Sequence, residues 1–249
     1  MINNMPTLSI IIPVRNEERI IGRTLKHLHD DLTAIDREII VSDDKSTDRT
    51  VEIAKQYANV IPHVFEGRST IGANRNNGAR YATGDYLVFT DADMTIPDPN
   101  AFFKKLISEF EKDKKMVGAT VKIKIRPDEA TLADDVMLEI MGFMQWFHNN
   151  LMRAGSASGE FQMIRREAFQ EMHGYREDLP VGEDNDLFMR LSGIGKTKMI
   201  WSLTAYTENR RAREMGWPKL LWTWTLNYFS VLLFNRSYTK EWKRTDGKH

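Results

Sequence analysis

Residues 74–93 read NRNNGARYATGDYLVFTDAD, and this stretch holds a helix, a strand and an acidic turn in close succession. Residues 74–82 look helical, and residues 85–90 (DYLVFT) form a short apolar run that predicts a buried strand. Asp91 and Asp93 follow that strand directly. A strand end or a tight turn can point both carboxylates at one place, so the stretch predicts a ligand site at the end of a strand.

Similar strand and helix patterns precede this stretch. Residues 8–13 (LSIIIP), 38–42 (EIIVS) and 60–65 (VIPHVF) read as strands, and residues 17–31 and 46–57 read as helices, the second one capped by Ser46 or Thr47. Near-continuous apolar strands that alternate with helices predict an α/β fold with a mainly parallel central sheet flanked by helices. In such sheets ligands bind beyond the carboxyl ends of the strands, where the polar clusters 15–18, 43–48 and 91–93 lie.

The second half of the chain has a less regular pattern. Residues 133–153 predict a long helix rich in Met and aromatic residues, and residues 155–159 (GSASG) predict a flexible loop. A short strand is expected at residues 161–164, with helices at residues 167–172 and 182–191. No repeat and no low-complexity linker divides the chain.

Composition excludes several classes of protein. The chain has 249 residues, with 35 Lys and Arg against 35 Asp and Glu, so the formal net charge is zero and argues against a general nucleic-acid binder. It contains no Cys, which excludes a disulfide scaffold and a thiol nucleophile. The N-terminal residues lack the basic and apolar regions of a signal peptide, so we expect a cytoplasmic chain.

Three acidic clusters are candidates for chemistry, and each has a structural alternative. Asp91 and Asp93 offer two hard oxygen ligands suited to Mg²⁺ or Mn²⁺ together with substrate phosphates, or they end a strand in a turn. Asp43 can accept a hydrogen bond from a nucleotide base, whereas Asp48 can equally form an Asx-turn or a helix cap. The acids that begin the helix at residues 182–191 either complement its dipole or supply a general base, with Asp184 as the candidate.

Taken together, the motifs resemble family 2 glycosyltransferases with the GT-A fold. They are IIPVRNEE (11–18), IIVSDDKSTDRT (39–50), NRNNGARYATGDYLVFTDAD (74–93), FQMIRREAF (161–169) and GEDNDLFMRL (182–191). The resemblance implies one GT-A catalytic domain over residues 1–205. Within it, residues 1–98 would form a Rossmann-like nucleotide-sugar-binding half and residues 99–205 an acceptor half. Residues 206–249 would form an amphipathic, basic and aromatic C-terminal segment.

The resemblance also implies how the donor is bound. Pro13 and Glu17 stand where the family holds the nucleoside, with Glu17 on the ribose hydroxyls. Asp43 matches the acid that meets the base. Arg75 falls in the segment that the family uses near the nucleotide and the donor sugar.

The remaining matches concern the metal and the base. Asp91 and Asp93 match the Asp-x-Asp signature, with Asp93 as the direct metal ligand and Asp91 also near the donor. Asp184 matches the family's proposed catalytic base. Two residues depart from the family pattern, because Arg15 stands where an aromatic or small residue is common and Lys45 replaces a usual glycine. These departures bear on base selectivity.

The implied activity is metal-dependent, inverting transfer of a hexose from a UDP- or GDP-sugar to a lipid-linked or saccharide acceptor, with Mn²⁺ or Mg²⁺ as cofactor. A polyprenyl-phosphate sugar synthase is an alternative, because its acceptor phosphate is already ionised and needs no strong base. A nucleotidyltransferase would usually show a Gly-rich, basic loop near its N-terminus, which PVRNEE is not. A non-catalytic nucleotide-sugar sensor would have no need of Asp91, Asp93 and Asp184 together.

The C-terminal segment is basic and aromatic. Residues 208–249 contain nine basic and four acidic side chains, and all of these except Lys219 flank WPKLLWTWTLNYFSVLLF at residues 217–234. This apolar run is shorter than the roughly 20 residues of a membrane span, so we expect a helix on an anionic membrane surface and a peripheral protein on the inner face. Packing in the core or in a homo-oligomer is the alternative. Arg210, Arg211 and Arg213 are candidates to fold back onto the donor diphosphate.

Overall fold

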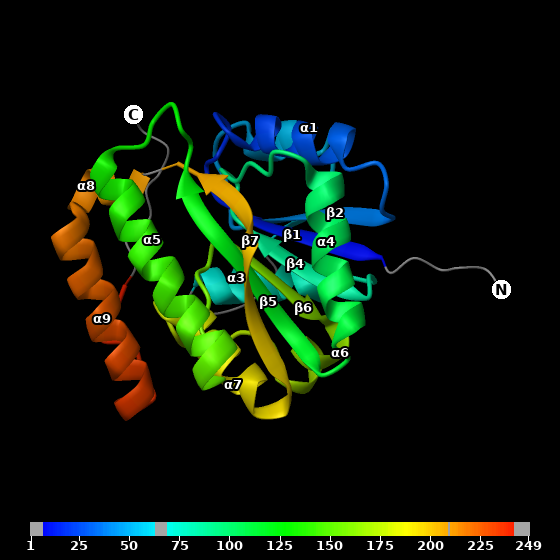
Figure 1. The fold of residues 1–249 in the computed structure, drawn as a ribbon. Helices are drawn as coiled ribbons and strands as arrows, with labels where there is room; N and C mark the ends of the chain where they lie inside the picture. Colours follow the sequence, from blue (N-terminus) through cyan, green and yellow to red (C-terminus); the bar gives the residue numbers. More distant parts are fainter. Residues whose placement is uncertain (1–6, 63–68, 209, 242–249) are drawn as a thin grey trace.

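The computed structural model describes residues 7–62, 69–208 and 210–241 (Figure 1). A seven-stranded sheet with the order β3-β2-β1-β4-β6-β5-β7 forms its centre. The strands are β1 (Leu8–Val14), β2 (Arg37–Asp43), β3 (Asn59–Pro62), β4 (Tyr86–Thr90), β5 (Met116–Ile125), β6 (Phe161–Arg165) and β7 (Lys196–Thr207). The helices are α1 (Ile21–Asp31), α2 (Thr50–Ala54), α3 (Ile71–Ala79), α4 (Pro99–Lys112), α5 (Leu132–Trp146), α6 (Arg166–Glu171), α7 (Glu183–Ile194), α8 (Arg210–Met215) and α9 (Trp217–Phe234), and a π-helical turn, η1 (Phe147–Met152), continues α5.

Strand pairing confirms the predicted, mainly parallel sheet. β1 pairs in parallel with β2 and β4, β2 with β3, and β5 with β7. β6 is antiparallel to both of its neighbours, β4 and β5. The start of β6 therefore lies at the same edge of the sheet as the carboxyl ends of the other strands, which adds residues near Glu160 to that edge.

Helices cover both faces of the sheet, which explains why its strands are nearly continuous in apolar residues. Successive strand residues point to opposite faces. Ile10 and Ile12 of β1 pack in one core with Leu25 of α1 and Phe103 of α4. Ile11 points the other way, into a second core that contains residues of α6 and α7. The carboxyl edge is consequently where polar groups of these strands can gather.

The helices after β1 and β2 begin later than the sequence predicts. α1 begins at Ile21 and α2 at Thr50, and neither Ser46 nor Thr47 caps α2. The intervening residues instead bind each other across the two loops: the Glu17 amide donates to Thr50 Oγ1 at 2.7 Å and the Asn16 amide to Ser46 Oγ at 2.9 Å. These bonds hold the loops after β1 and β2 together beside the sheet edge.

Residues 155–159 do not form the predicted flexible loop. Gly155, Ser156 and Ala157 are buried. Asn149 Nδ2 donates to the Ser156 carbonyl and the Ser156 amide donates back to Asn149 Oδ1 at 3.1 Å. These bonds hold the segment against η1, and its small side chains allow it to pack closely in the buried position.

The sequence patterns also do not predict α4, β5 and β7. α4 carries ordinary start signals, because the Asp98 side chain accepts from the Ala101 amide at 2.9 Å and Pro99 occupies the first turn. β5 and β7 form the far side of the sheet beneath α5. α9 lies beside α5 at this end of the molecule (Figure 1), and Trp217 Nε1 of α9 donates to Asp134 Oδ1 of α5 at 2.7 Å.

Replacement of Gly155 by Ala should lower the free energy of unfolding by at least about 2 kcal/mol. Gly155 has a φ of +71°, and an added Cβ would lie 2.0 Å from the Phe188 carbonyl oxygen. The control is Gly193→Ala in α7, where an added Cβ meets no atom within 4 Å. That change should stabilise the helix by up to about 1 kcal/mol. Denaturant unfolding of both variants measures the two effects, and equal effects would contradict the packing of this segment.

Candidate active site

A cavity of about 710 Å³ opens at the carboxyl edge of the sheet. The loop after β1 contributes Pro13 and Glu17 to its lining, and the turn after β4 contributes Asp91 and Asp93. Its volume lies in the range of pockets that hold small-molecule ligands. The structure therefore brings together four of the side chains that the sequence identifies as donor or metal ligands.

Asp91 and Asp93 are placed by the turn that ends β4. The Asp91 amide donates to the Glu160 carbonyl at 3.3 Å, and the Met94 amide donates to the Asp91 carbonyl at 3.4 Å. Asp93 is only 5% exposed. Burial raises the pKa of both carboxyls above their ordinary value, because a charged carboxylate loses hydration there. A cation at this place would restore their charge balance.

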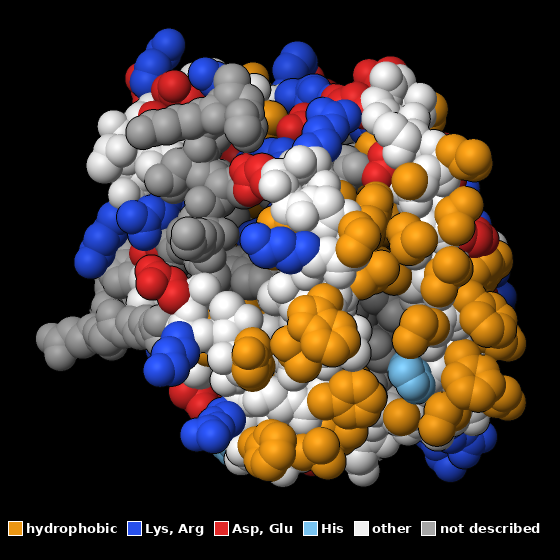
Figure 2. Space-filling model, turned by 90° about the vertical axis from the view of Figure 1, so that its left-hand side faces the viewer, with side chains coloured by type: hydrophobic (Ala, Val, Ile, Leu, Met, Phe, Trp, Pro, Cys, Tyr) orange, Lys and Arg blue, Asp and Glu red, His pale blue; other side chains and the backbone are white. Residues whose placement is uncertain are grey.

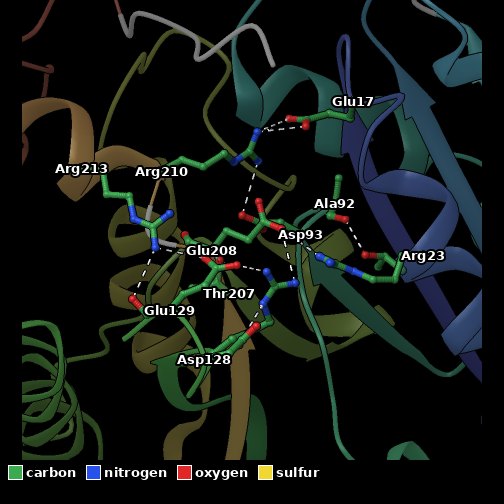
Figure 3. Close-up of polar contacts among 12 residues, drawn as sticks. Glu17, Arg23, Ala92, Asp93, Asp128, Glu129, Thr207, Glu208, Arg210 and Arg213 are labelled. Carbon is green, nitrogen blue, oxygen red and sulfur yellow. Dashed lines mark hydrogen bonds and ion pairs between the residues drawn. The ribbon is translucent and has the colours of Figure 1, made fainter. Parts of the chain in front are cut away.

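Arg210, the first residue of α8, reaches this acidic group from the C-terminal segment (Figure 3). Its Nη1 lies 3.0 Å from Glu17 Oε2, and its Nη2 lies 3.4 Å from Asp93 Oδ2. Burial raises the pKa of Glu17 to about 7, while the Arg210 guanidinium acts in the opposite direction. Arg210 thus supplies positive charge at the place where the sequence predicts a metal.

The three C-terminal arginines point to different places. Arg211 lines the cavity, where burial lowers the pKa of its guanidinium. Arg213 is more than half exposed and turns away from the cavity, with its Nη2 3.3 Å from Glu129 Oε2 (Figure 3). The structure therefore brings Arg210 and Arg211, but not Arg213, to the predicted donor site.

A network of ion pairs fixes the point where α8 begins. Glu208, just after β7, binds Arg23 of α1 at 2.9 Å and lies 3.5 Å from Arg126, which follows β5 (Figure 3). The Thr95 amide also donates to the Tyr206 carbonyl at 2.8 Å. These contacts tie the end of β7 to the loop after β4, so that α8 starts over the cavity.

A second cavity of about 200 Å³ adjoins the first one. The two share Asp91, Glu160 and Arg211 in their linings, and the second is also lined by Asp184. The Asn185 amide donates to Asp184 Oδ1 at 2.7 Å. Burial and the neighbouring Glu183 raise the pKa of Asp184 to about 7. Asp184 is accordingly a group that can take up a proton near neutral pH.

Arg75 lines the second cavity and is buried among carboxylates. Its guanidinium is 1% exposed, with Nη1 2.9 Å from Glu183 Oε1 and Nη2 3.4 Å from Asp91 Oδ1. Nη2 also donates to the Gly159 carbonyl at 2.7 Å. Both terminal nitrogens are therefore engaged by protein oxygens, and the geometry makes Arg75 a positioning residue between the turn after β4 and the start of α7.

Asp43 is not brought to the cavity. Its carboxylate accepts from the Ser46 amide at 3.2 Å, within a turn whose residue Lys45 has a φ of +60°. This left-handed conformation explains why related turns favour glycine at that position. The neighbouring Asp44 lies 3.6 Å from Arg15, which lines the cavity. Contact of Asp43 with a base remains a prediction.

Sequence reasoning did not identify Glu160 and Glu208, which also line the larger cavity. Glu160 directly precedes β6, and its position becomes visible only when β6 is known to run antiparallel. Glu208 follows β7, a strand that the patterns do not predict. Like Asp91 and Asp93, both acids lie at the end of a strand that reaches the carboxyl edge of the sheet.

The donor set fits a divalent cation that shares its ligands with a substrate. Within the described ranges, no three Asp, Glu or His side chains come close enough to hold a metal by themselves. Asp91 and Asp93 would supply two carboxylates, and Mg²⁺ is commonly held by one or two carboxylates together with phosphate oxygens. In the structure, the guanidinium of Arg210 places a positive charge 3.4 Å from Asp93, next to the carboxylates that would hold the metal.

Curated relatives match the sequence over most of its length. The chain is 25% identical over 228 residues to hyaluronan synthase of Pasteurella multocida, which covers 88% of this chain and 22% of that protein. It is 28% identical over 254 residues to the probable glycosyltransferase YdaM of Bacillus subtilis, covering 95% of this chain and 59% of that one. The chain thus spans less than two thirds of the length of these relatives.

Solved structures share the fold at low sequence identity. A mannosyltransferase of Pyrobaculum calidifontis in complex with GDP-Man and Mn²⁺ has a TM-score of 0.69 at 18% identity, covering 93% of this chain and 65% of that chain. Glucosyl-3-phosphoglycerate synthase of Mycobacterium tuberculosis with Mn²⁺ and UDP-glucose has a TM-score of 0.61 at 21% identity, covering 92% and 79%. The profile of glycosyl transferase family 2 matches residues 9–172, more than half of the sequence, and the chain therefore belongs to glycosyl transferase family 2.

Proposed function

We propose that this glycosyltransferase moves a hexose from a UDP- or GDP-sugar to an acceptor hydroxyl, with inversion at the anomeric carbon. The observation that carries the proposal is the pair of adjoining cavities, one lined by Asp91 and Asp93 and the other by Asp184. A nucleotide diphosphate would occupy the larger cavity, and the acceptor would enter the smaller one. Asp91 lines both, so the sugar would lie at their junction.

The residues of the chain divide the reaction between them. Glu17 and Pro13 would hold the nucleoside, and Arg210 and Arg211 would bind the diphosphate. Asp184 would take the proton of the acceptor hydroxyl as its oxygen bonds to the anomeric carbon and the bond from that carbon to the diphosphate oxygen breaks. Asp91 and Asp93 would hold Mn²⁺ or Mg²⁺, which when bound offsets the negative charge that develops on the diphosphate.

The neighbours support either nucleotide. The Pyrobaculum calidifontis protein was solved with GDP-Man, and TarS of Staphylococcus aureus was solved with UDP-GlcNAc at a TM-score of 0.64. A polyprenyl-phosphate acceptor is the second candidate. Arg211, which lines the smaller cavity together with Asp184, favours it, because a guanidinium can bind an acceptor phosphate there.

Metal dependence should be visible in donor binding. UDP or GDP with Mn²⁺ should raise the melting temperature of the native chain by several degrees at saturating ligand, because a ligand that binds only the folded state stabilises it. Asp93→Asn should lose the metal-dependent part of that rise and all turnover. Asp36→Asn is the control, since Asp36 is exposed before β2 at the opposite edge of the sheet. Full turnover of the native chain in excess EDTA would refute the metal assignment.

Asp184→Asn should slow the chemical step with a hydroxyl acceptor by roughly 10²–10⁴-fold and leave nucleotide affinity unchanged. Turnover of the native enzyme should rise as pH passes through about 7, where Asp184 ionises. A native turnover rate in this variant with a hydroxyl acceptor would show that Asp184 is not the base. A native rate only with a lipid phosphate would favour the polyprenyl-phosphate reaction.

The same substitution has a consequence for stability. Because the pKa of Asp184 is higher in the folded than in the unfolded chain, the folded state favours the protonated acid. Its contribution to the free energy of unfolding is fully present below the unfolded-state pKa and is lost as pH rises through about 7. Asn resembles the protonated acid at every pH. The gain in melting temperature from Asp184→Asn should therefore be larger at pH 8 than at pH 5.

Arg210 and Arg213 form a matched pair for the diphosphate assignment. Arg210→Ala should weaken binding of the nucleoside diphosphate with Mn²⁺ by about 10- to 100-fold, since charged hydrogen bonds contribute about 1.5–3 kcal/mol. Arg213→Ala should change it less than twofold, because Arg213 is directed at Glu129. Isothermal titration calorimetry measures both affinities. Equal effects of the two substitutions would exclude a specific diphosphate contact by Arg210.

A further inference from the structure

α9 is apolar on two opposite sides, and only one of them is covered. Its inward side carries Leu220 and Val231, which are buried, and Trp224, which lines both cavities. Its outward side carries Trp222 and Leu233, which are 65% and 67% exposed. A helix that is hydrophobic all round is normally buried all round. The outward side of α9 therefore lacks a covering surface within the described chain.

α5 and η1 repeat this arrangement beside α9. Leu138 and Met141 line the cavities, whereas Ile140 and Phe143 on the outward side are at least half exposed. Figure 2 shows hydrophobic side chains gathered over this side of the molecule. We call the exposed large apolar side chains of α5, η1 and α9 the docking face; they are Leu132, Val136, Ile140, Phe143, Met144, Phe147, Leu151, Met152, Trp222, Phe229, Leu232, Leu233 and Phe234. Contiguous apolar surfaces of this kind mark interaction sites.

Basic side chains flank the docking face. Arg153 follows η1, Lys219 lies in the first turn of α9, and Arg236 and Lys240 follow its end, all four exposed. None of them makes an ion pair with another residue in the described part of the chain. Glu139, an acid of α5 near the face, lies 3.9 Å from both Lys122 and Lys124. Two exposed acids, Asp135 beside Val136 on α5 and Glu241 after Lys240, also lie near the face, so basic side chains are in excess but not alone there. This excess suits anionic lipid headgroups.

A bilayer fits these observations better than a second copy of the chain. A two-fold interface would bring the same surface of both copies together, and with it both sets of basic side chains. Among the described residues, no helix is long and apolar enough to cross a membrane. α5 and α9 would accordingly lie along the bilayer surface, with Trp222 and the aromatic residues near it at headgroup level.

The smaller cavity lies between the inward sides of the same two helices. Met141 and Gln145 of α5 line it opposite Trp224 and Tyr228 of α9, and Asp184 lies in its wall. The cavity that contains Asp184 is therefore walled by the same two helices that carry the docking face. The apolar lining residues Met141 and Trp224 suit the lipid-proximal part of an acceptor.

We propose that the docking face binds anionic bilayers and that the acceptor is carried by a lipid whose polar head enters between α5 and α9. The part of this proposal that concerns the acceptor rests on the proposed function. Binding of the face to lipid does not, because it requires neither donor nor turnover.

The test is co-sedimentation of the full chain with vesicles of phosphatidylcholine alone or mixed with phosphatidylglycerol. The native chain should bind the mixed vesicles more tightly, and binding should fall as salt screens the basic margin. Phe143→Glu on α5 and Leu233→Glu on α9 should each weaken binding at least tenfold, because each removes an exposed apolar contact and adds negative charge. Tyr81→Glu is the control, since Tyr81 is 48% exposed on the turn after α3, outside the docking face.

Further measurements separate the possible outcomes. Equal melting temperatures of the variants and the native chain would show that loss of binding is not loss of folding. Asp184→Asn should bind vesicles like the native chain, so a failed base assignment leaves the docking result intact. No binding of the native chain to mixed vesicles at low salt would overturn the proposal. A native dimer in sedimentation velocity that Phe143→Glu and Leu233→Glu convert to monomers, without vesicle binding, would assign the face to a second copy instead.

Discussion

The buried guanidinium of Arg75 is the constraint on which the arrangement of the site depends. A cation that is 1% exposed loses its hydration and needs carboxylates within reach, and Arg75 finds them in Asp91 after β4 and Glu183 at the start of α7. Arg75 Nη2, the nitrogen that approaches Asp91, also donates to the Gly159 carbonyl. A Cβ added at Gly159 would lie only 2.9 Å from this nitrogen, so the guanidinium packs closely against the glycine. One side chain thereby fixes the distance between the proposed metal ligands and the proposed base.

In the larger cavity at the carboxyl edge of the sheet, carboxylates rather than guanidinium groups are in excess. Glu17, Asp93 and Glu208 line the same cavity. Glu208 is paired with Arg23 and Arg126, whereas Glu17 and Asp93 share the guanidinium of Arg210. Arg210 offsets part of this charge from a position 193 residues away from Glu17 in the sequence. A nucleotide diphosphate with its metal would replace these contacts: the metal would take over Asp93, and the phosphates would take over the guanidinium. Arg210 at the start of α8 therefore lines the same cavity as the loops at the sheet edge, and the proposed donor site includes it.

The sequence was sufficient to predict the nucleotide half of the fold and less of the other half. β1, β2 and β4 are buried on both faces, so their sequences are continuous apolar runs that end in acids, and the placement of Pro13, Glu17, Asp91 and Asp93 follows from the sheet edge. β5 does carry a strand signal, because Lys122 and Lys124 alternate with the buried residues Val121, Ile123 and Ile125, and this signal was missed. The role of Asp43 remains a prediction: its carboxylate accepts from the Ser46 amide within the turn itself, and Asp43 is not among the residues that line the cavity.

The segment 217–234 shows why periodicity alone could not decide between a membrane surface and a packed core. Its inward residues, such as Leu220 and Val231, are spaced like the core face of a helix, and its outward residues, such as Trp222 and Leu233, have the same spacing on the other side. Because apolar residues then occur on both sides of the helix, the sequence does not show one apolar and one polar face. The inward pattern belongs to the walls of the two cavities, with Leu220 in the larger one and Val231 in the smaller one, and the outward pattern is exposed. Packing against the domain, one of the two alternatives, therefore describes the inward side of this helix, whereas contact of the outward side with a membrane remains a proposal.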